Sequence, residues 1–339
     1  MRAVATQSGK IIITEIENTN PPAGHVRIRT EYSAISPGTE MTFIKRAAEQ
    51  PVVLGYSAVG IIDQIGEDVT GLQEGQRVAC YGAPYVRHAE WMNVPANLTA
   101  VVPEHVRPQD AAFAGLGAIA IHALRTADLR FGESAIVVGL GILGQIMAQI
   151  ASAAAFRVAG MDLNAERVQL LKQHGMKHAY ANEELLEEHL EKAVGGHGAD
   201  CVLLCAAGPG EELINRSFKW IRDKGKIVIV GDLSTSFSRG LMFGKEAEVL
   251  ISRAGGPGRY DASYERDNRD YPIGFVRWTE GRNIGEYIRL LAEERIQVDS
   301  LISHIFPLER AEEAYANYLK PGAVLGTLLK YVNGESEES

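Results

Sequence analysis

Three glycines, Gly139, Gly141 and Gly144, lie between an apolar, β-rich run and an amphipathic stretch. In a Gly-x-Gly-x-x-Gly turn the first glycine permits a tight turn, the second lets the backbone approach a pyrophosphate, and the third lets the helix pack against the strand. The phosphates would lie beside Ile142 and Leu143 at the start of the helix, where unpaired N–H groups and the positive end of the helix dipole favour anions. The stretch therefore predicts a dinucleotide-binding βα unit.

An acidic residue, Asp162, follows Gly144 by 18 residues at the end of a second apolar run. Dinucleotide-binding folds place a carboxylate on the adenosine ribose about 20 residues after the glycines. Because a carboxylate there repels a 2′-phosphate, the sequence favours NAD over NADP, although Arg167 would weaken that preference. Cys205 ends another apolar run, where open parallel sheets hold ligands, so it is predicted either to line the cofactor site or only to pack.

Length and composition narrow the class of protein. The chain has 339 residues, of which 46% are hydrophobic and 23% charged, and single cores rarely exceed ~250–300 residues, so two domains are expected. The net charge of −9 disfavours nucleic-acid and membrane partners, and no run approaches the ~18 apolar residues of a membrane span. The N-terminus turns polar too early for a signal peptide, and three cysteines without a Cys-x-x-Cys pair favour a reducing compartment. We expect a cytoplasmic protein that acts on a small molecule.

The elements that position these residues fall into a β-rich part and a part in which strands and helices alternate. Period-2 alternation predicts strands at 10–16, 25–32, 59–65 and 76–81, and helical spacing begins at 109 and continues to 124. Many short strands favour a small barrel or sandwich. Later strands are predicted at 135–138, 157–162, 199–206, 224–231 and 248–252, with helices at 143–154, 165–174 and 183–193. The alternation predicts an α/β protein with a doubly wound parallel sheet.

The pattern changes again after residue 254. Residues 255–278 form a predicted loop rich in arginine and aromatic side chains, which would either bind a polyhydroxylated or anionic substrate or form a subunit contact. Helices are predicted at 284–294 and 308–318, a last strand at 326–331, and a frayed acidic tail at 334–339.

Several segments resemble the medium-chain dehydrogenase/reductase superfamily, in its zinc-type alcohol dehydrogenase group. Besides the glycine turn they are 55–62, 75–79, 88–95 and 225–231. The resemblance implies a GroES-like catalytic domain from 1–115 and 255–339, an inserted Rossmann domain at 116–254, and assembly as a homodimer or homotetramer. It also implies hydride transfer between a nicotinamide and an alcohol carbon, with Arg167 flanking the adenine. Residues 36–40 and 252–260 look like the subgroup of bacteriochlorophyllide-dehydrogenase-like and bidomain oxidoreductases.

The chain departs from this family at the catalytic zinc. Ser36 stands where the family has a cysteine ligand, and Tyr56 with Ser57 replaces the ligand histidine and its acidic neighbour. The third ligand position falls in 114–116, where no side chain can coordinate a metal. Because a catalytic zinc needs three N, S or O side chains, the sequence predicts an enzyme without zinc.

Without zinc, a side chain must handle the hydroxyl proton as hydride leaves. His88 is the first candidate because histidine titrates near neutrality; alternatively it is a hydrogen-bonded residue of a turn. Thr39 matches the hydroxyl relay of the family, and Glu40 either orients the site or caps a helix. Tyr56 either directs its phenol at the substrate or packs in the core. A rearranged metal site built from Glu40, Cys80 and His88 is the remaining alternative.

The sequence thus leaves three functions open. The first is an NAD-dependent oxidoreductase acting on a secondary alcohol or ketone, such as a polyol or sugar derivative. The second is a zinc-free, NADPH-dependent enone or quinone reductase, which Asp162 and the first glycine of the turn disfavour. The third is an NAD-binding sensor or structural protein without catalysis.

Overall fold

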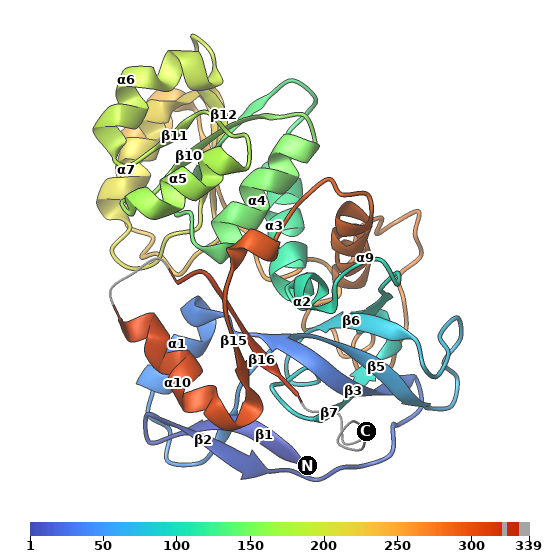
Figure 1. The fold of residues 1–339 in the computed structure, drawn as a ribbon. Coiled ribbons are helices and arrows are strands. Elements are labelled where there is room, and N and C mark those ends of the chain that lie inside the picture. Colours follow the sequence, from blue (N-terminus) through green and yellow to red (C-terminus); the bar gives the residue numbers. More distant parts are fainter. Residues whose placement is uncertain (321–323, 332–339) are drawn as a thin grey trace. The chain divides into compact units, whose positions relative to one another are not determined.

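The computed structural model describes residues 1–320 and 324–331, so the tail predicted at 334–339 lies outside the described residues. The chain packs as two compact units (Figure 1). Unit 1 contains Met1–Ala118, Gly255–Glu294 and the chain from Val298 onward, whereas unit 2 contains Ile119–Ala254 and Arg295–Gln297.

Unit 1 is built on strands from both ends of the chain. Its strands are β1 (Arg2–Gln7), β2 (Lys10–Glu15), β3 (His25–Ala34), β4 (Val52–Val53), β5 (Ser57–Ile65), β6 (Arg77–Tyr81), β7 (Trp91–Pro95), β8 (Thr99–Val101), β15 (Ile302–Pro307) and β16 (Gly326–Lys330). One sheet has the order β15-β16-β3-β5-β6-β8, with β7 also paired to β3, and a second has the order β2-β1-β4. Because β16 pairs antiparallel with β3, the C-terminal segment completes a sheet that begins near the N-terminus.

Short helices cover the ends of these strands. They are α1 (Pro37–Lys45), α2 (Pro108–Ala111), α9 (Glu280–Ala292) and α10 (Ala311–Ala316), with 3-10 turns at Ala96–Leu98, Asp299–Leu301, Leu308–Arg310 and Asn317–Leu319. One core cluster fills the space beneath β3, β5, β6 and β7. Another joins Val4 and Ile35 to Phe306 and Leu329, so apolar burial ties the two chain ends together.

Unit 2 is a doubly wound α/β fold. Its strands are β9 (Ser134–Val138), β10 (Arg157–Met161), β11 (Ala179–Tyr180), β12 (Ala199–Leu204), β13 (Ile221–Ile229) and β14 (Glu248–Ile251). Its helices are α4 (Ile142–Ala153), α5 (Ala165–Gln173), α6 (Glu183–Val194), α7 (Glu211–Trp220) and α8 (Arg239–Lys245), while α3 (Ala114–Ala127) leads into it from unit 1. The strands pair in parallel in the order β11-β10-β9-β12-β13-β14. This order confirms the predicted Rossmann-type sheet.

Both faces of this sheet are buried by helices. Ile136 and Val138 of β9 belong to a core cluster with side chains of α6 and α7. Val137, which points to the other face, lies against the first turn of α4. The strand Ser134–Val138 is apolar from Ala135 onward and buried at every position, and it therefore has the environment that its sequence predicts.

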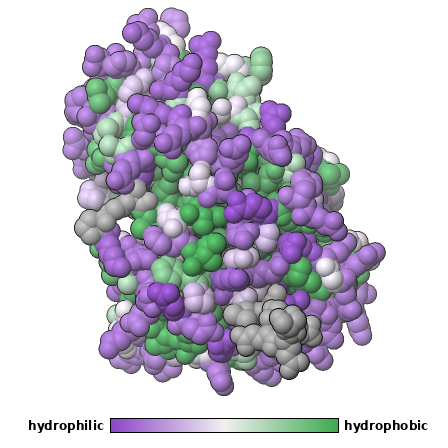
Figure 2. Space-filling view, viewed as in Figure 1, coloured by the Kyte–Doolittle hydropathy of each residue, from purple (hydrophilic) through white to green (hydrophobic). Residues whose placement is uncertain are grey.

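The surface in view in Figure 2 is mostly hydrophilic, with smaller hydrophobic areas between the charged side chains. Over the described parts of the chain, the structure contains no helix with the length and apolar character needed to cross a bilayer.

Candidate active site

The glycine turn has the backbone geometry that each of its three positions requires. Gly139 has φ +89°, a value that favours glycine. An ideal Cβ at Gly144 would lie 1.9 Å from the Gly139 carbonyl oxygen, so only glycine lets α4 approach β9 so closely. An ideal Cβ at Gly141 would meet only the Arg167 guanidinium, at 4.0 Å. The space above Gly141 is therefore open, as the approach of a phosphate requires.

The start of α4 completes the predicted phosphate site at the glycine turn. Gly141 is the N-cap, no side chain caps the helix, and its first residues are Ile142 and Leu143. Helix N-termini carry N–H groups without intrahelical partners and attract anions. The turn and the helix start thus fit the pyrophosphate of a dinucleotide.

The structure places the other predicted cofactor residues around this turn. Asp162 Oδ2 accepts a hydrogen bond from the Leu140 N–H at 2.7 Å, and its Oδ1 accepts one from Asn164 N–H at 2.8 Å. Arg167 Nη1 lies 3.5 Å from Asp162 Oδ2. The carboxylate therefore braces the glycine turn itself, a contact that sequence spacing does not indicate.

Cys205 lies at the point where the strand order of the sheet reverses. Its N–H donates to the Val138 carbonyl at 2.8 Å, and an ideal Cβ at Gly139 would come within 3.1 Å of the Cys205 carbonyl carbon. Its thiol is 3.7 Å from Met147 Sδ, and burial raises the pKa of this thiol to about 12. The residue borders the glycine turn as a neutral thiol.

A cluster of hydroxyl groups in unit 1 contains two of the predicted catalytic residues. The Tyr56 hydroxyl donates to Oγ of Ser36, the N-cap residue of α1. The pKa of Tyr56 is raised to about 12, mainly by burial and also by the Glu40 carboxylate, while the hydrogen bonds with Ser36 and Thr39 act in the opposite direction. Thr39 is exposed and Tyr56 is partly exposed. Three hydroxyls thus meet near the surface, and Tyr56 remains a protonated phenol at neutral pH.

Behind these hydroxyls lies a buried network centred on Glu40, which is 1% exposed. Glu40 Oε1 accepts from the Ser36 N–H at 2.8 Å, and Oε2 accepts from Tyr315 and lies 2.9 Å from His88 Nε2. His88 Nδ1 lies 2.6 Å from Ser33 Oγ. Through one oxygen Glu40 therefore bonds to the backbone at the start of α1, and through the other it contacts Tyr315 and His88.

His88 is completely buried. Its side chain is 0% exposed, and both ring nitrogens have protein partners. The ring reaches Glu40, and through Glu40 the backbone of Ser36, but has no direct bond to Tyr56. The geometry supports the alternative of a buried, hydrogen-bonded histidine that positions Glu40, and a role in proton transfer stays a prediction.

The structure gives the positions of the candidate metal ligands. Glu40 and His88 are in contact, but the Cys80 thiol donates to the Ala58 carbonyl at 3.6 Å, and its burial raises the pKa of the thiol. Ser57, in the place of the family's acidic residue, bonds to the backbone of Ala112 and Gly115. Within residues 1–320 and 324–331 no three His, Cys, Asp or Glu side chains converge on a point where a metal could bind.

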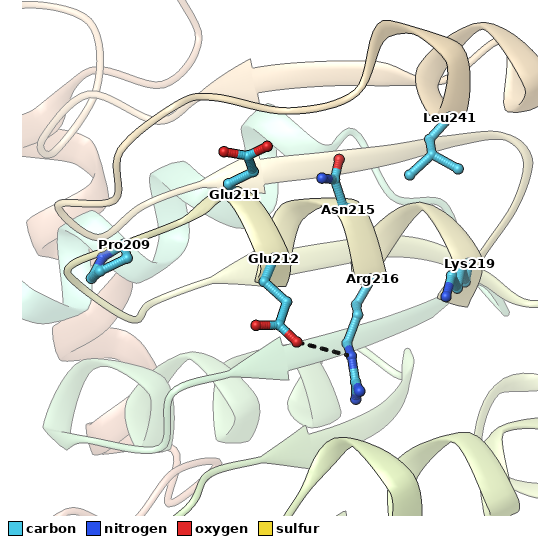
Figure 3. A pocket seen from close by; sticks show the side chains of 7 residues that line it. All are labelled: Pro209, Glu211, Glu212, Asn215, Arg216, Lys219 and Leu241. Carbon is cyan, nitrogen blue, oxygen red and sulfur yellow. Dashed lines mark ion pairs between the residues drawn. The ribbon is translucent and has the colours of Figure 1, made fainter.

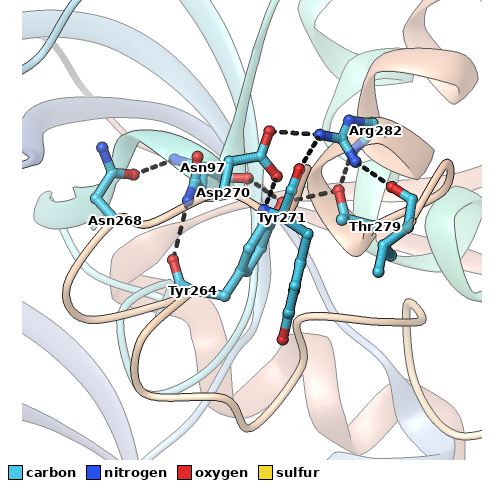
Figure 4. Close-up of polar contacts among 8 residues, drawn as sticks. Asn97, Tyr264, Asn268, Asp270, Tyr271, Thr279 and Arg282 are labelled. Carbon is cyan, nitrogen blue, oxygen red and sulfur yellow. Dashed lines mark hydrogen bonds and ion pairs between the residues drawn. The ribbon is translucent and has the colours of Figure 1, made fainter. Parts of the chain in front are cut away.

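Two tyrosines of the loop at 255–278 make contacts within the protein that hold the loop in place (Figure 4). Tyr264 is buried, donates to Thr279 Oγ1 at 2.9 Å, and stacks on Tyr271 at 5.4 Å between ring centroids. Asn97 donates to the Tyr264 carbonyl at 3.0 Å, and Arg282 bonds to Asp270. Sequence reasoning did not foresee that these polar groups bond to one another.

A surface hollow on unit 2 lies elsewhere in the fold (Figure 3). It is lined by Pro209 and by side chains of α7 and α8, and none of the glycine-turn residues contributes to it. Arg216, in its wall, already lies 3.2 Å from Glu184 and 3.9 Å from Glu212.

Two family models match the chain. The model for the alcohol dehydrogenase GroES-like domain matches residues 22–128, and the model for zinc-binding dehydrogenases matches 143–266. Among related proteins, D-guloside 3-dehydrogenase of Escherichia coli (strain K12) is 26% identical over 94% of this chain and 95% of its own length. The 2-dehydro-3-deoxy-L-galactonate 5-dehydrogenase of Pseudoalteromonas atlantica is 25% identical over 88% of this chain and 89% of its own length.

Solved structures have the same fold. Galactitol-1-phosphate dehydrogenase from Escherichia coli aligns with a TM-score of 0.79 and 20% identity, over 97% of this chain and 100% of that one. The chain belongs to the medium-chain dehydrogenase/reductase superfamily. The GroES-like fold predicted for the β-rich part and the Rossmann-type sheet are both confirmed.

As a member of this superfamily, the protein is an NAD(P)-dependent oxidoreductase of the alcohol dehydrogenase type. Two further structures of the same fold were solved with cofactor. One is an Escherichia coli alcohol dehydrogenase with NADH, which aligns with a TM-score of 0.78 and 20% identity over 97% of this chain and 99% of that one. The other is a Sinorhizobium meliloti dehydrogenase with NADP, which aligns with a TM-score of 0.76 and 18% identity over 97% of this chain and 98% of that one.

Two of the three glycines in this dehydrogenase's turn, Gly141 and Gly144, should respond differently when a methyl group is added. Gly141→Ala is expected to melt like the wild type but to bind NADH at least about tenfold more weakly, because its Cβ enters space that is open in the structure. Gly144→Ala should instead lower the melting temperature, because its Cβ overlaps the Gly139 oxygen. Thermal melts and NADH fluorescence titrations measure both effects. Unchanged NADH binding by Gly141→Ala would show that the phosphates do not approach there.

Proposed function

We propose that the protein is an NAD-dependent dehydrogenase that interconverts a secondary alcohol and a ketone of a polyol or sugar derivative, without catalytic zinc. The observation that carries this proposal is the hydroxyl cluster of Ser36, Thr39 and Tyr56 at the partly exposed edge of unit 1. The substrate class follows from two of the relatives, a D-guloside 3-dehydrogenase and a 2-dehydro-3-deoxy-L-galactonate 5-dehydrogenase.

The glycine turn and the start of α4 would hold NAD(P), which would supply the hydride acceptor for the alcohol or the hydride donor for the ketone. In ketone reduction, the Tyr56 hydroxyl turns from Ser36 to the substrate oxygen and donates its proton as the hydride arrives on carbon. Hydrogen bonds from Ser36 and Thr39 then stabilise the phenolate, just as they lower the pKa of Tyr56 in the free protein. In alcohol oxidation the phenolate takes the hydroxyl proton, so this direction is favoured by higher pH.

The preference for NAD rests on the contacts of Asp162. Its carboxylate lies beside the glycine turn, at the end of the second strand of the sheet, where it would accept hydrogen bonds from ribose hydroxyls and repel a 2′-phosphate. Arg167, at 3.5 Å from this carboxylate, offsets part of the negative charge. Because Arg167 offsets only part of the negative charge of Asp162, we propose NAD as the cofactor that the enzyme uses.

The side chains that could bind a metal support a mechanism without zinc. Ser36, where the family has a cysteine ligand, bonds to Tyr56 instead, and Cys80 bonds to a backbone carbonyl rather than to Glu40 or His88. The residues present do not fit a tetrahedral zinc site. A small-molecule substrate, a homodimeric or homotetrameric assembly, and the absence of nucleic-acid or membrane partners stay predictions from the sequence.

A panel of polyols and sugar derivatives, assayed with NAD and with NADP after dialysis against EDTA, tests the proposal. We expect turnover of at least one panel member with NAD, at least about tenfold in kcat/KM over NADP, and no gain on adding Zn²⁺. Preference for NADPH together with reduction of enones or quinones would favour the second alternative. Cofactor binding without turnover of any compound would favour the sensor hypothesis, and activity that returns only with Zn²⁺ would overturn the zinc-free mechanism.

A further inference from the structure

Glu280, the first residue of α9, is a buried carboxyl group that the mechanism above does not use. Its side chain is 0% exposed, and neither Oε1 nor Oε2 pairs with a cation or a backbone N–H; the polar group that it meets is another carboxyl group, that of Glu265. Its backbone N–H donates to the Pro257 carbonyl at 2.8 Å. Buried carboxyl groups normally pair with a cation or a hydrogen-bond donor, so one that meets a second carboxyl group calls for a physical reason.

A buried ion pair lies next to Glu280. Arg259 bonds to Glu265, with side-chain exposures of 9% and 7%, and Arg259 Nη2 also donates to the Ala83 carbonyl at 2.7 Å. Burial raises the pKa of Glu280, and the charge of Glu265 and a hydrogen bond with it act in the same direction; although Arg259 lowers it, the pKa is about 9. One guanidinium, one carboxylate and one neutral carboxylic acid therefore make a cluster without net charge.

Few other ionisable groups face this cluster. Tyr81 on β6 and the loop residues Tyr264 and Tyr271 each have a pKa raised in part by Glu280. Asp110 on α2, which packs against α9, interacts with Arg107 and Asp299 instead. On α9 itself, Arg282 pairs with Asp270. Arg259 is thus the cation that faces Glu280, and it is already bonded to Glu265.

The cluster is linked to the proposed catalytic phenol through Tyr81. An ideal Cβ at Gly255 would lie 2.6 Å from the Tyr81 ring and 3.2 Å from Glu280 Cβ, so the start of the loop packs between β6 and α9. The Tyr81 ring in turn meets the Tyr56 ring edge to face, at 5.7 Å between centroids. A shift of the loop therefore reaches Tyr56 through one aromatic contact.

We propose that Glu280 works as a neutral carboxylic acid that keeps the segment 255–279 seated against Tyr81, and thereby positions Tyr56 for proton transfer. Loss of the Glu280 proton puts two carboxylates beside one guanidinium in a buried site and releases the segment. Glu280 is a positioning residue, since it acts through Tyr81. The catalytic part of this inference rests on the proposed function, whereas the seating of the segment does not.

The kinetic test compares the wild type with Glu280→Gln, which imitates the neutral acid at every pH. Ketone reduction is measured from pH 6 to pH 10, where Tyr56 stays protonated. We expect the wild-type kcat to fall about tenfold between pH 8 and pH 10, with a smaller change in KM. Glu280→Gln should keep its kcat over this range. The control Glu293→Gln, at the exposed residue that follows the last residue of the same helix, should behave like the wild type. Identical alkaline losses in Glu280→Gln and the wild type would overturn the proposal.

A second measurement needs no substrate. Arg266 and Arg269 are exposed trypsin sites within the segment, so mass spectrometry can follow cleavage there at pH 7.5 and pH 9.5, relative to a denatured control. We expect wild-type cleavage to accelerate severalfold at the higher pH and Glu280→Gln cleavage to stay slow. A wild type that shows this acceleration but no dehydrogenase activity would refute the proposed function alone. Equal cleavage at both pH values would refute the role of Glu280.

Stability gives a third measurement, with a definite sign. The folded state holds the Glu280 proton up to about pH 9, whereas a carboxyl group in the unfolded chain loses it near its ordinary value of 4.5. The folded state therefore binds more protons between these values, and stability falls as pH rises through that window. Glu280→Gln should melt above the wild type at pH 8, and the difference should shrink toward pH 5; a variant that melts below the wild type at pH 8 would contradict the proposal.

Discussion

Tyr56→Phe is expected to lower kcat for ketone reduction by about 10²–10⁴, the usual contribution of a general acid. The change removes one hydroxyl and leaves the ring, so the edge-to-face contact with Tyr81 is kept. The Ser36 hydroxyl, in a residue that is 7% exposed, loses one hydrogen bond but keeps its place beside the exposed Thr39. The effect should therefore appear in kcat, with little change in melting temperature or in NADH affinity. Steady-state kinetics, a thermal melt and a cofactor titration separate these quantities.

Tyr85→Phe is the matched control, since Tyr85 lies in the same unit, packs against the core cluster, and belongs to neither the hydroxyl cluster nor the Glu40 network. It should keep the wild-type kcat. If Tyr56→Phe also keeps it, the proton passes through another group and the proposed mechanism is wrong. The oxidation rate offers an internal check: because burial raises the pKa of Tyr56 to about 12, the wild-type rate should still be rising with pH between pH 7 and pH 8.5.

Glu40→Ala is expected to lower the melting temperature by roughly 6–12 °C, which corresponds to about 3 kcal/mol for a domain of this size. Removing this carboxylate leaves His88, Tyr315 and the Ser36 N–H without their buried acceptor. Orphaned buried donors lose a hydrogen bond without regaining water, which is the costly way to break such a network. The variant should also lose activity, because α1 carries Ser36 and Thr39 at its start.

The control for this prediction is Glu212→Ala, whose side chain is 88% exposed. Exposed ion pairs contribute about 0–1 kcal/mol, so its melting temperature should stay within about 2 °C of the wild type. Differential scanning calorimetry is the suitable measurement, because it resolves separate transitions if the two units melt apart. A melting temperature of Glu40→Ala close to that of Glu212→Ala would mean that the buried network adds little to stability.

The sequence by itself predicted the glycine turn for the cofactor and the parallel sheet that carries it. Gly139, Gly141 and Gly144 are local requirements of one turn, and strand-helix alternation follows from burial on both faces of a parallel sheet. Such signals depend on residues close together in the chain, so spacing alone predicts them. The substitutions at Ser36 and Tyr56 were likewise visible in the sequence, because each departs from a family pattern at a single position.

Only the tertiary structure decided the surroundings of the candidate catalytic and positioning residues. His88 was predicted either to transfer a proton or to be a hydrogen-bonded residue of a turn; the fold buries it against Glu40, 48 residues away, and pairs its other ring nitrogen with Ser33. Glu280 carried no signal in the sequence, since a glutamate at the start of a helix normally faces solvent. Its neutral state comes from burial beside Glu265 and Arg259, which only the packing of the 255–279 segment brings together. Charge state depends on desolvation and on neighbours in space, and neither can be read from spacing along the chain.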